Sequence, residues 1–278
     1  MNKITKCLCV GLMAMGFTAC ADLDLNPLSE GSSENWYHDA SEIEMSLNDL
    51  WRPDFFPIDG LDWDDDLLNR NGSNEFTLGT MTAQSGTVSG RWTSLYKAIA
   101  RATKVLESLE KGTATGVSAE KVNQYKGEAF FMLGFAYGEL ATYWGDCVLN
   151  KGMTLDEAYV ATRSPKSDVL AYAYECLDKA ASLLPLSYSG QQRPTAGAAL
   201  GMKARFALCN NDWQVAADAA KKVMDSNVYS LHPDYGELFK ADASPELMFY
   251  FKGDLALKKG FGLFENVKNY VIRKLGGY

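Results

Sequence analysis

The sequence predicts a mainly α-helical protein whose helices are arranged in pairs, with one long irregular loop segment near the start. Two observations lead to this fold class. From Arg91 onward, apolar residues recur every three to four positions over several long stretches, which is the spacing of amphipathic helices. Residues 53–90, in contrast, are rich in Gly, Asn, Ser and Asp and show no apolar period. Because 47% of the 278 residues are hydrophobic, the chain can form a substantial core.

The first expected helix follows Asp39. Residues 39–42 have the pattern of a capping box, and Pro53 and Pro57 stop the apolar period that follows. Later helices are bounded by similar signals, such as Pro165 at a first helical position. The apolar stripes predict five further helices, over residues 92–109, 118–144, 165–184, 195–210 and 212–226.

These helices are joined by short turns, and alanines at 129, 136, 204 and 219 would allow neighbouring helices to approach closely. Paired helices with small residues at their crossings indicate a tetratricopeptide-like superhelix. The spacing does not follow a regular repeat of about 34 residues. An unrelated helical bundle therefore stays open as the alternative.

The N-terminus has the anatomy of an export signal. Two lysines precede an apolar run over residues 7–17, which is too short to span a bilayer. Cys20 directly follows Phe17-Thr18-Ala19, as in a bacterial lipobox, where the cysteine thiol takes a diacylglycerol. The sequence predicts a lipoprotein signal peptide over residues 1–19, lipidation of Cys20, and a tether over residues 20–38. A plain secretory signal with an incidental Cys20 is the alternative.

Composition argues against several classes of function. The formal net charge of −8 disfavours binding to nucleic acid. Cys147, Cys176 and Cys209 are too few and too widely spaced for a disulfide framework. Neither His38 nor His232 has a partner at metal-ligand spacing, and no phosphate-binding loop or nucleophile motif is present. We expect no enzymatic activity, no cofactor and no metal site. Asp62, Asp64, Asp65 and Asp66 lack the glycine and distal glutamate of an EF-hand loop, so a solvated acidic loop is favoured, with a calcium site as the alternative.

The irregular segment contains aromatic residues that no helical period explains. Phe55, Phe56, Trp63 and Phe76 alternate with Asp, Asn and Arg. Flat aromatic rings beside amide and carboxylate groups suit sugars, because the C–H faces of a sugar stack on the rings while its hydroxyls form hydrogen bonds. The alternative is that this segment packs onto the helices or onto a partner protein.

Several stretches resemble one known family when taken together. These stretches are CADLDLNP from Cys20, KGEAFFMLGFAYGELATYWGD over residues 126–146, RPTAGAALGMKARFAL over 193–208, and YGELF over 235–239. Over residues 20–251 the chain resembles the SusD/RagB outer-membrane nutrient-uptake lipoproteins of Bacteroidetes. Residues 39–251 would then form the N-terminal helical domain of that family.

The resemblance implies a tetratricopeptide-type scaffold on the outer face of the outer membrane, anchored through a lipid on Cys20. It implies capture of an oligosaccharide or other nutrient and delivery to a SusC-like TonB-dependent transporter, as part of polysaccharide utilisation. It places ligand contacts in the loop before the first conserved helix. The candidates there are Trp63, Asn71, Asn74 and Phe76. Starch is unsupported as the ligand, because the matching stretch LLNRNGSNEFTLG has no tryptophan.

One departure concerns length. Members of the family are usually much longer, so residues 252–278 are expected to be the start of an apparently truncated C-terminal region. Two other hypotheses stay open on the sequence alone. In the first hypothesis, the chain is a structural helical-repeat adaptor that holds a membrane complex together and itself binds no small molecule. In the second, it is a non-functional truncated fragment.

Overall fold

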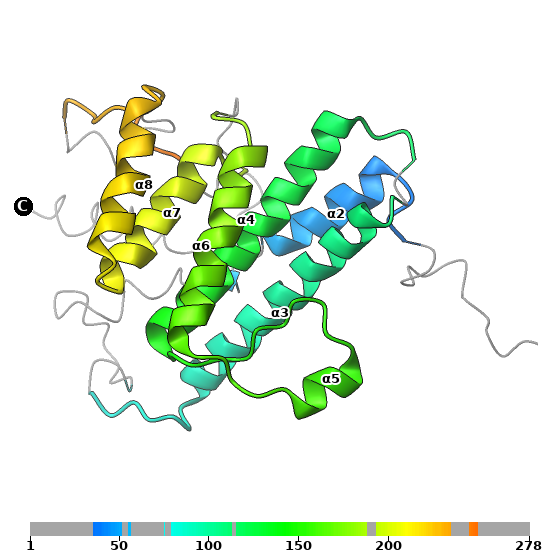
Figure 1. Cartoon of the computed structure of the whole chain (residues 1–278), viewed down its shortest axis with the longest axis vertical. Helices are drawn as coiled ribbons and strands as arrows, with labels where there is room; N and C mark the ends of the chain where they lie inside the picture. Colours follow the sequence, from blue (N-terminus) through cyan, green and yellow to red (C-terminus); the bar gives the residue numbers. More distant parts are fainter. Residues whose placement is uncertain are drawn as a thin grey trace, which may run out of the picture.

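The computed structural model describes residues 36–51, 55–56, 75, 79–112, 115–187, 193–234 and 245–249, and this part of the chain is mostly helical (Figure 1). It contains α2 (Ala40–Leu50), α3 (Gly86–Glu110), α4 (Ala119–Tyr143), α5 (Leu155–Val160), α6 (Lys166–Leu183), α7 (Ala196–Cys209) and α8 (Trp213–Asp225). The described residues form no β-strand, and only an isolated bridge joins Cys147 to Ser164. The predicted fold class, a mainly α tetratricopeptide-like arrangement, is confirmed.

The predicted helices are all present, and two local differences stand out. Helix α3 begins at Gly86, so the irregular segment ends earlier than residue 90. Helix α5 was not predicted, because it has only 6 residues and no apolar stripe of its own. It forms because Thr154 and Glu157 make a capping box, in which each side chain accepts a hydrogen bond from the other residue's backbone N–H.

Polar side chains start several of these helices. Asp39, Ser118 and Thr195 each accept a hydrogen bond from a backbone N–H in the first turn of α2, α4 and α7. At α2 the predicted capping box is modified. The Glu42 carboxylate accepts from the backbone N–H of His38, at 2.6 Å, and not from that of Asp39. The sequence pattern therefore predicts the helix start correctly and one of the two bonds incorrectly.

Helix α4 occupies the centre of the stack. It packs against α3 on one side and α6 on the other, and it also contacts α2 and α7 (Figure 1). Helix α7 packs against both α6 and α8, which places α8 at the edge of the stack. Apart from the short α5, successive helices are thus spatial neighbours, as expected of helical-pair repeats.

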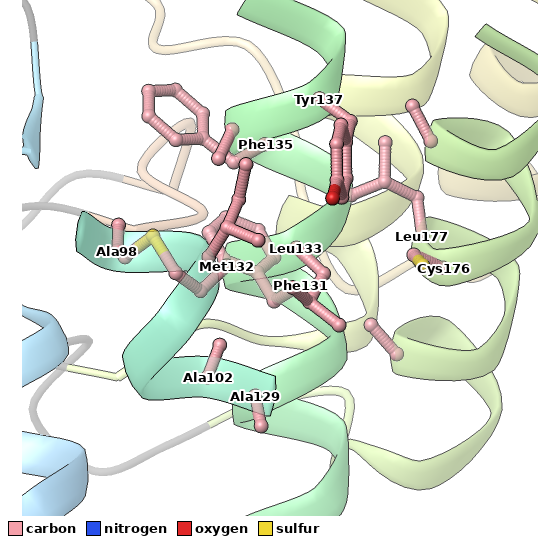
Figure 2. Close-up of a cluster of buried hydrophobic side chains, with 14 of the residues drawn as sticks. Ala98, Ala102, Ala129, Phe131, Met132, Leu133, Phe135, Tyr137, Cys176 and Leu177 are labelled. Atoms are coloured by element: carbon pink, nitrogen blue, oxygen red, sulfur yellow. The ribbon is translucent and has the colours of Figure 1, made fainter. Parts of the chain in front are cut away.

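The core lies between α3, α4 and α6. Figure 2 shows Ala98 and Ala102 of α3 facing large apolar side chains of α4, with Cys176 and Leu177 of α6 on the other side. The predicted small residues Ala129 and Ala136 are fully buried at these crossings.

Glycines in α4 allow an even closer approach than the alanines. A Cβ added at Gly134 would lie 2.5 Å from Cγ of Leu177, and one at Gly138 would lie 2.4 Å from the ring of Phe206. Such distances are well inside van der Waals contact, so only glycine fits at these crossings. These glycines fix the separation of α4 from α6 and α7.

Candidate functional site

The residues predicted to carry function fall where the structure gives no description. Cys20, Trp63, Asn71, Asn74 and Phe76 lie outside the described residues. Their assignment stays a prediction. The structure does describe Phe55, Phe56 and Glu75, which flank three of them (Trp63, Asn71 and Asn74), and it shows how these flanking residues are held on the helices.

At the start of the segment, two phenylalanines pack onto the scaffold. Phe55 is buried, and the guanidinium of Arg101 lies 5.1 Å from its ring centre. The ring of Phe56 lies 4.8 Å from that of Phe135 in α4. The prediction that Phe55 stacks on a sugar is therefore wrong, and the ring of Phe56 packs against that of Phe135. The alternative stated above, packing of the segment onto the helices, holds for these two residues.

At the other end, Glu75 is tied to the beginning of α3. The Thr87 hydroxyl donates to the Glu75 carboxylate at 3.2 Å, and the backbone N–H of Thr80 donates to the Glu75 carbonyl at 2.9 Å. Phe56 and Glu75 are therefore both held by contacts with the helices.

The start of the segment rests on a set of five rings, which we call the aromatic cluster: Trp51, Phe56, Phe131, Phe135 and Phe249. Their closest ring centres are 4.8–6.3 Å apart, the range of favourable aromatic contacts. The cluster joins the end of α2, the middle of α4 and residues 245–249. Two stretches that are far apart in sequence thus meet on one face of α4.

Residues 245–249 are held beside α7 and the end of α8. The Thr195 hydroxyl donates to the Met248 carbonyl at 3.2 Å. The backbone N–H of Ser230 donates to the Pro245 carbonyl at 3.2 Å, and that of His232 donates to the Glu246 carboxylate at 2.6 Å. These bonds bring Phe249 into the aromatic cluster.

Two buried ion pairs lie on the same face of α4. Glu128 and Glu139 are three helical turns apart, and they are 1% and 6% exposed. Arg193 binds Glu128 at 2.8 Å, and Arg91 binds Glu139 at 3.2 Å. Burial raises the pKa of both carboxyl groups, and the neighbouring arginines oppose this rise. Each arginine thus offsets the free-energy cost of burying a charged carboxylate, which would be neutral at this depth without its partner.

The two pairs also connect the cluster to other elements. Arg193 hydrogen-bonds Asn48 of α2 as well as Glu128 of α4, so it joins the two helices that carry Trp51 and Phe131. Arg91 of α3 lies 6.0 Å from the ring centre of Phe135. None of the residues in the two ion pairs is among the predicted site residues. The available signal was the presence of two glutamates inside an otherwise apolar stretch of α4.

This arrangement is suited to support and positioning. Its carboxylates are buried and bound by arginines, which leaves them poorly placed for acid–base chemistry. Within the described ranges, no group of three or more His, Cys, Asp or Glu side chains could hold a metal ion. In the same part of the chain, no helix is long and apolar enough to cross a membrane.

Comparison with known families gives a match that covers the helices from α3 through most of α7, but not Trp51, Phe56 or Phe249 of the aromatic cluster. A family model named SusD-like, described as starch-binding and associating with the outer membrane, matches residues 62–208. Among curated proteins, a SusD-like protein from Bacteroides ovatus is 24% identical in an alignment of 258 positions that covers 85% of this chain and 47% of the relative. A second, from Formosa agariphila, is 23% identical over 61% of this chain and 32% of its own length. The chain thus spans half or less of the length of these relatives.

Solved structures show the same fold. A SusD-like carbohydrate-binding protein from Bacteroides fragilis has a TM-score of 0.69 at 23% identity, covering 78% of this chain and 47% of its own. A SusD superfamily protein from Bacteroides thetaiotaomicron has a TM-score of 0.66 at 19% identity, over 80% and 55%. A third structure, described as being with a xylogluco-oligosaccharide, has a TM-score of 0.62 at 20% identity, over 76% and 46%.

Proposed function

The chain belongs to the SusD-like family of carbohydrate-binding proteins, and we propose that it acts as an outer-membrane surface lipoprotein that captures an oligosaccharide and delivers it to a SusC-like TonB-dependent transporter. The observation that carries this proposal is the family match over residues 62–208. That range runs from the irregular segment through most of α7, so it includes both the predicted ligand-binding residues and the helices that hold them.

The structure supports the proposal through the way the segment is anchored. Phe56 in the aromatic cluster and Glu75 at α3 fix the two ends of the chain that contains Trp63, Asn71 and Asn74. Fixing the ends reduces the conformational entropy that ligand binding would otherwise cost. One relative of the same fold is described with a xylogluco-oligosaccharide, which makes β-glucan fragments a first class of ligand to test.

Binding is tested by isothermal titration calorimetry of the full chain against a panel of oligosaccharides. The panel includes xylogluco-oligosaccharides and, as an expected non-ligand, malto-oligosaccharides. Replacing Trp63 with Ala should weaken binding at least about tenfold, because stacking on an aromatic ring is lost. Tyr159→Ala is the matched control, since Tyr159 of α5 is an aromatic residue that is 86% exposed. An equal loss in both variants, or no loss for Trp63→Ala, would contradict the site assignment.

The lipid anchor is tested separately. Cells that produce the chain are labelled with radioactive palmitate and then fractionated. We expect label in the outer-membrane fraction for the wild type and no label after Cys20→Ser, which removes the acylated thiol while retaining a polar residue of similar size. Cys209→Ser serves as the control, because Cys209 is an exposed free cysteine. Incorporation of label that survives the Cys20 change would show that the anchor lies elsewhere.

A structural adaptor is the second candidate function, and one observation favours it. Helix α5 presents Tyr159 and Val160, which are 86% and 79% exposed, at the tip of a hairpin braced by two hydrogen bonds between the Tyr137 hydroxyl and the backbone of Asn150. A rigid apolar tip suits contact with another protein. Co-purification of the lipidated chain with a TonB-dependent transporter is expected under both functions. Glycan binding in the titration is expected only under the proposed nutrient-capture function.

A further inference from the structure

Helix α8 has two apolar faces, and only one of them is covered by α7. Ala216, Ala219 and Val223 form the buried face. The second face consists of Trp213, Ala217, Ala220 and Met224, which are all exposed. Trp213 is 61% exposed and Met224 is 74% exposed.

The spacing of the exposed face shows that it is continuous. Its residues are at positions i, i+4, i+7 and i+11, so they align along one side of the helix for its full length. The last helix of a repeat stack usually presents a polar outer face to water. Helix α8 lies at the edge of the stack in Figure 1 and presents an apolar face there, so it has the character of an internal helix.

A complementary pattern occurs later in the same chain. Phe264, Val267, Val271 and Leu275 are at positions i, i+3, i+7 and i+11. This stripe has the same length as the exposed face of α8. The stripe has bulky residues at both ends, as the α8 face does with Trp213 and Met224. The centre of the α8 face consists of two alanines, which allow a partner helix to approach closely.

The net charge of the segment also favours contact with the rest of the chain. Residues 257–278 contain five Lys or Arg residues and a single Glu, in a chain whose net charge is −8. Helix α8 adds nothing to this attraction by itself, because Asp218 and Asp225 are balanced by Lys221 and Lys222. The basic segment is attracted to the acidic protein as a whole.

The attachment point of the segment is close enough to α8. Residues 245–249 are hydrogen-bonded to Ser230 and His232, which follow the C-terminal end of α8. The 14 residues from 250 to 263 can span more than about 40 Å when extended. A helix of 13 residues is only about 20 Å long, so the stripe can reach any part of the α8 face.

We propose that residues 264–275 dock on the exposed face of α8 through their apolar stripe and extend the helical stack by one further element. This proposal does not depend on the ligand or the transporter. It commits to an intramolecular occupant, because charge, pattern and reach all favour the chain's own segment. A second copy of the chain and an unrelated protein are the competing occupants.

The test is site-specific photo-crosslinking in the full chain. Benzoylphenylalanine replaces Gln214, which is exposed beside the apolar face, so that both alanines of the face are retained, and crosslinked peptides are identified by mass spectrometry. The control replaces Ala100, an exposed alanine of α3. We expect peptides from residues 260–278 to be recovered from position 214 at least about fivefold more than from position 100. An equal mixture of isotopically heavy and light protein distinguishes crosslinks within one chain from those between chains.

A second measurement uses variants of the segment itself. Val271→Asp places a charge on the apolar stripe and should reduce the yield at position 214 at least about threefold. Asn269→Asp adds the same charge on the opposite side of the stripe and should leave the yield unchanged. Mixed heavy–light crosslinks would overturn the proposal in favour of a second copy. The absence of crosslinks to residues 260–278, or an equal effect of the two variants, would overturn it outright.

Discussion

Helices α4 and α8 belong to the same stack but are held in it in different ways. Helix α4 is buried over most of its length, with glycines against neighbouring side chains and two glutamates bound to arginines in the interior. Helix α8 buries only Ala216, Ala219 and Val223, and its ion pair between Lys221 and Asp225 is largely exposed. The difference indicates that stability is concentrated at α4, whereas α8 is an edge that tolerates change.

The largest effect is expected for Arg193→Ala. This change leaves the Glu128 carboxylate buried without its partner and disconnects α4 from Asn48 of α2. We expect the free energy of unfolding to fall by about 3 kcal/mol, because breaking one side of a buried ion pair costs about 3–5 kcal/mol and Arg193 retains some exposure. Urea denaturation measures this loss. Arg193→Lys retains the charge and should lose less; equal losses would show that charge compensation is not the cause.

Gly138→Ala should be the next most disruptive change. The added methyl group would overlap the ring of Phe206, and overpacking of this kind costs about 1–3 kcal/mol. The matched control is Gly90→Ala in α3, where a Cβ would meet nothing within 4 Å. That control should gain up to about 1 kcal/mol from helix propensity. Opposite shifts in the denaturation midpoint are expected, and a loss of stability in both variants would contradict this account of α4.

The pH dependence of stability sharpens the comparison further. Burial raises the pKa of Glu128, so this carboxyl group holds its proton more tightly in the folded chain than in the unfolded chain. Its contribution to stability is therefore present below the unfolded-state pKa of about 4.3 and is lost as the pH rises through the folded-state pKa. Glu128→Gln removes this titration.

The free energy of unfolding of Glu128→Gln, relative to the wild type, should accordingly increase between about pH 4 and about pH 7. Denaturation at a series of pH values provides the measurement. The pKa of Glu139 is raised for the same reason, but Glu139 is present in both proteins and its contribution cancels. If the stability of Glu128→Gln relative to the wild type stays constant or decreases over this range, Arg193 affects the pKa of Glu128 more strongly than burial does.

The smallest effect is expected at α8. Lys221→Ala removes an exposed pair with Asp225, and such pairs rarely contribute more than about 0.5 kcal/mol. We expect a shift in the midpoint of thermal unfolding that is close to experimental error. A loss comparable to that of Arg193→Ala would remove the distinction between the two helices.

The sequence predicts the fold well for a physical reason. Long amphipathic stretches and N-cap residues such as Asp39 and Thr195 act locally, so they can be identified without knowing what they pack against. Helix α5 was missed because it has only 6 residues and no apolar stripe, although Thr154 and Glu157 have the sequence pattern of a capping box. The start of α3 at Gly86 was missed because GTVSG has the composition of a loop.

The site is less predictable than the fold. Phe55 and Phe56 share the local composition of the candidate ligand-binding residues, yet they pack onto the helices. Composition alone does not separate an aromatic residue that anchors a segment from one that faces a ligand. Arg193 is equally inconspicuous, because its importance arises from contacts with Asn48 and Glu128, which are far from it in sequence.

The attachment of the chain at Phe56 and Glu75 has a consequence for how such a protein can diversify. When both anchor points belong to the scaffold, the entropy of closing the connection grows only slowly with its length, by about 0.6 kcal/mol for each doubling. Replacement of the intervening stretch by one of another length or composition would then cost little stability. Under the proposed function, exchanging this stretch between relatives would change ligand specificity on an unchanged helical frame.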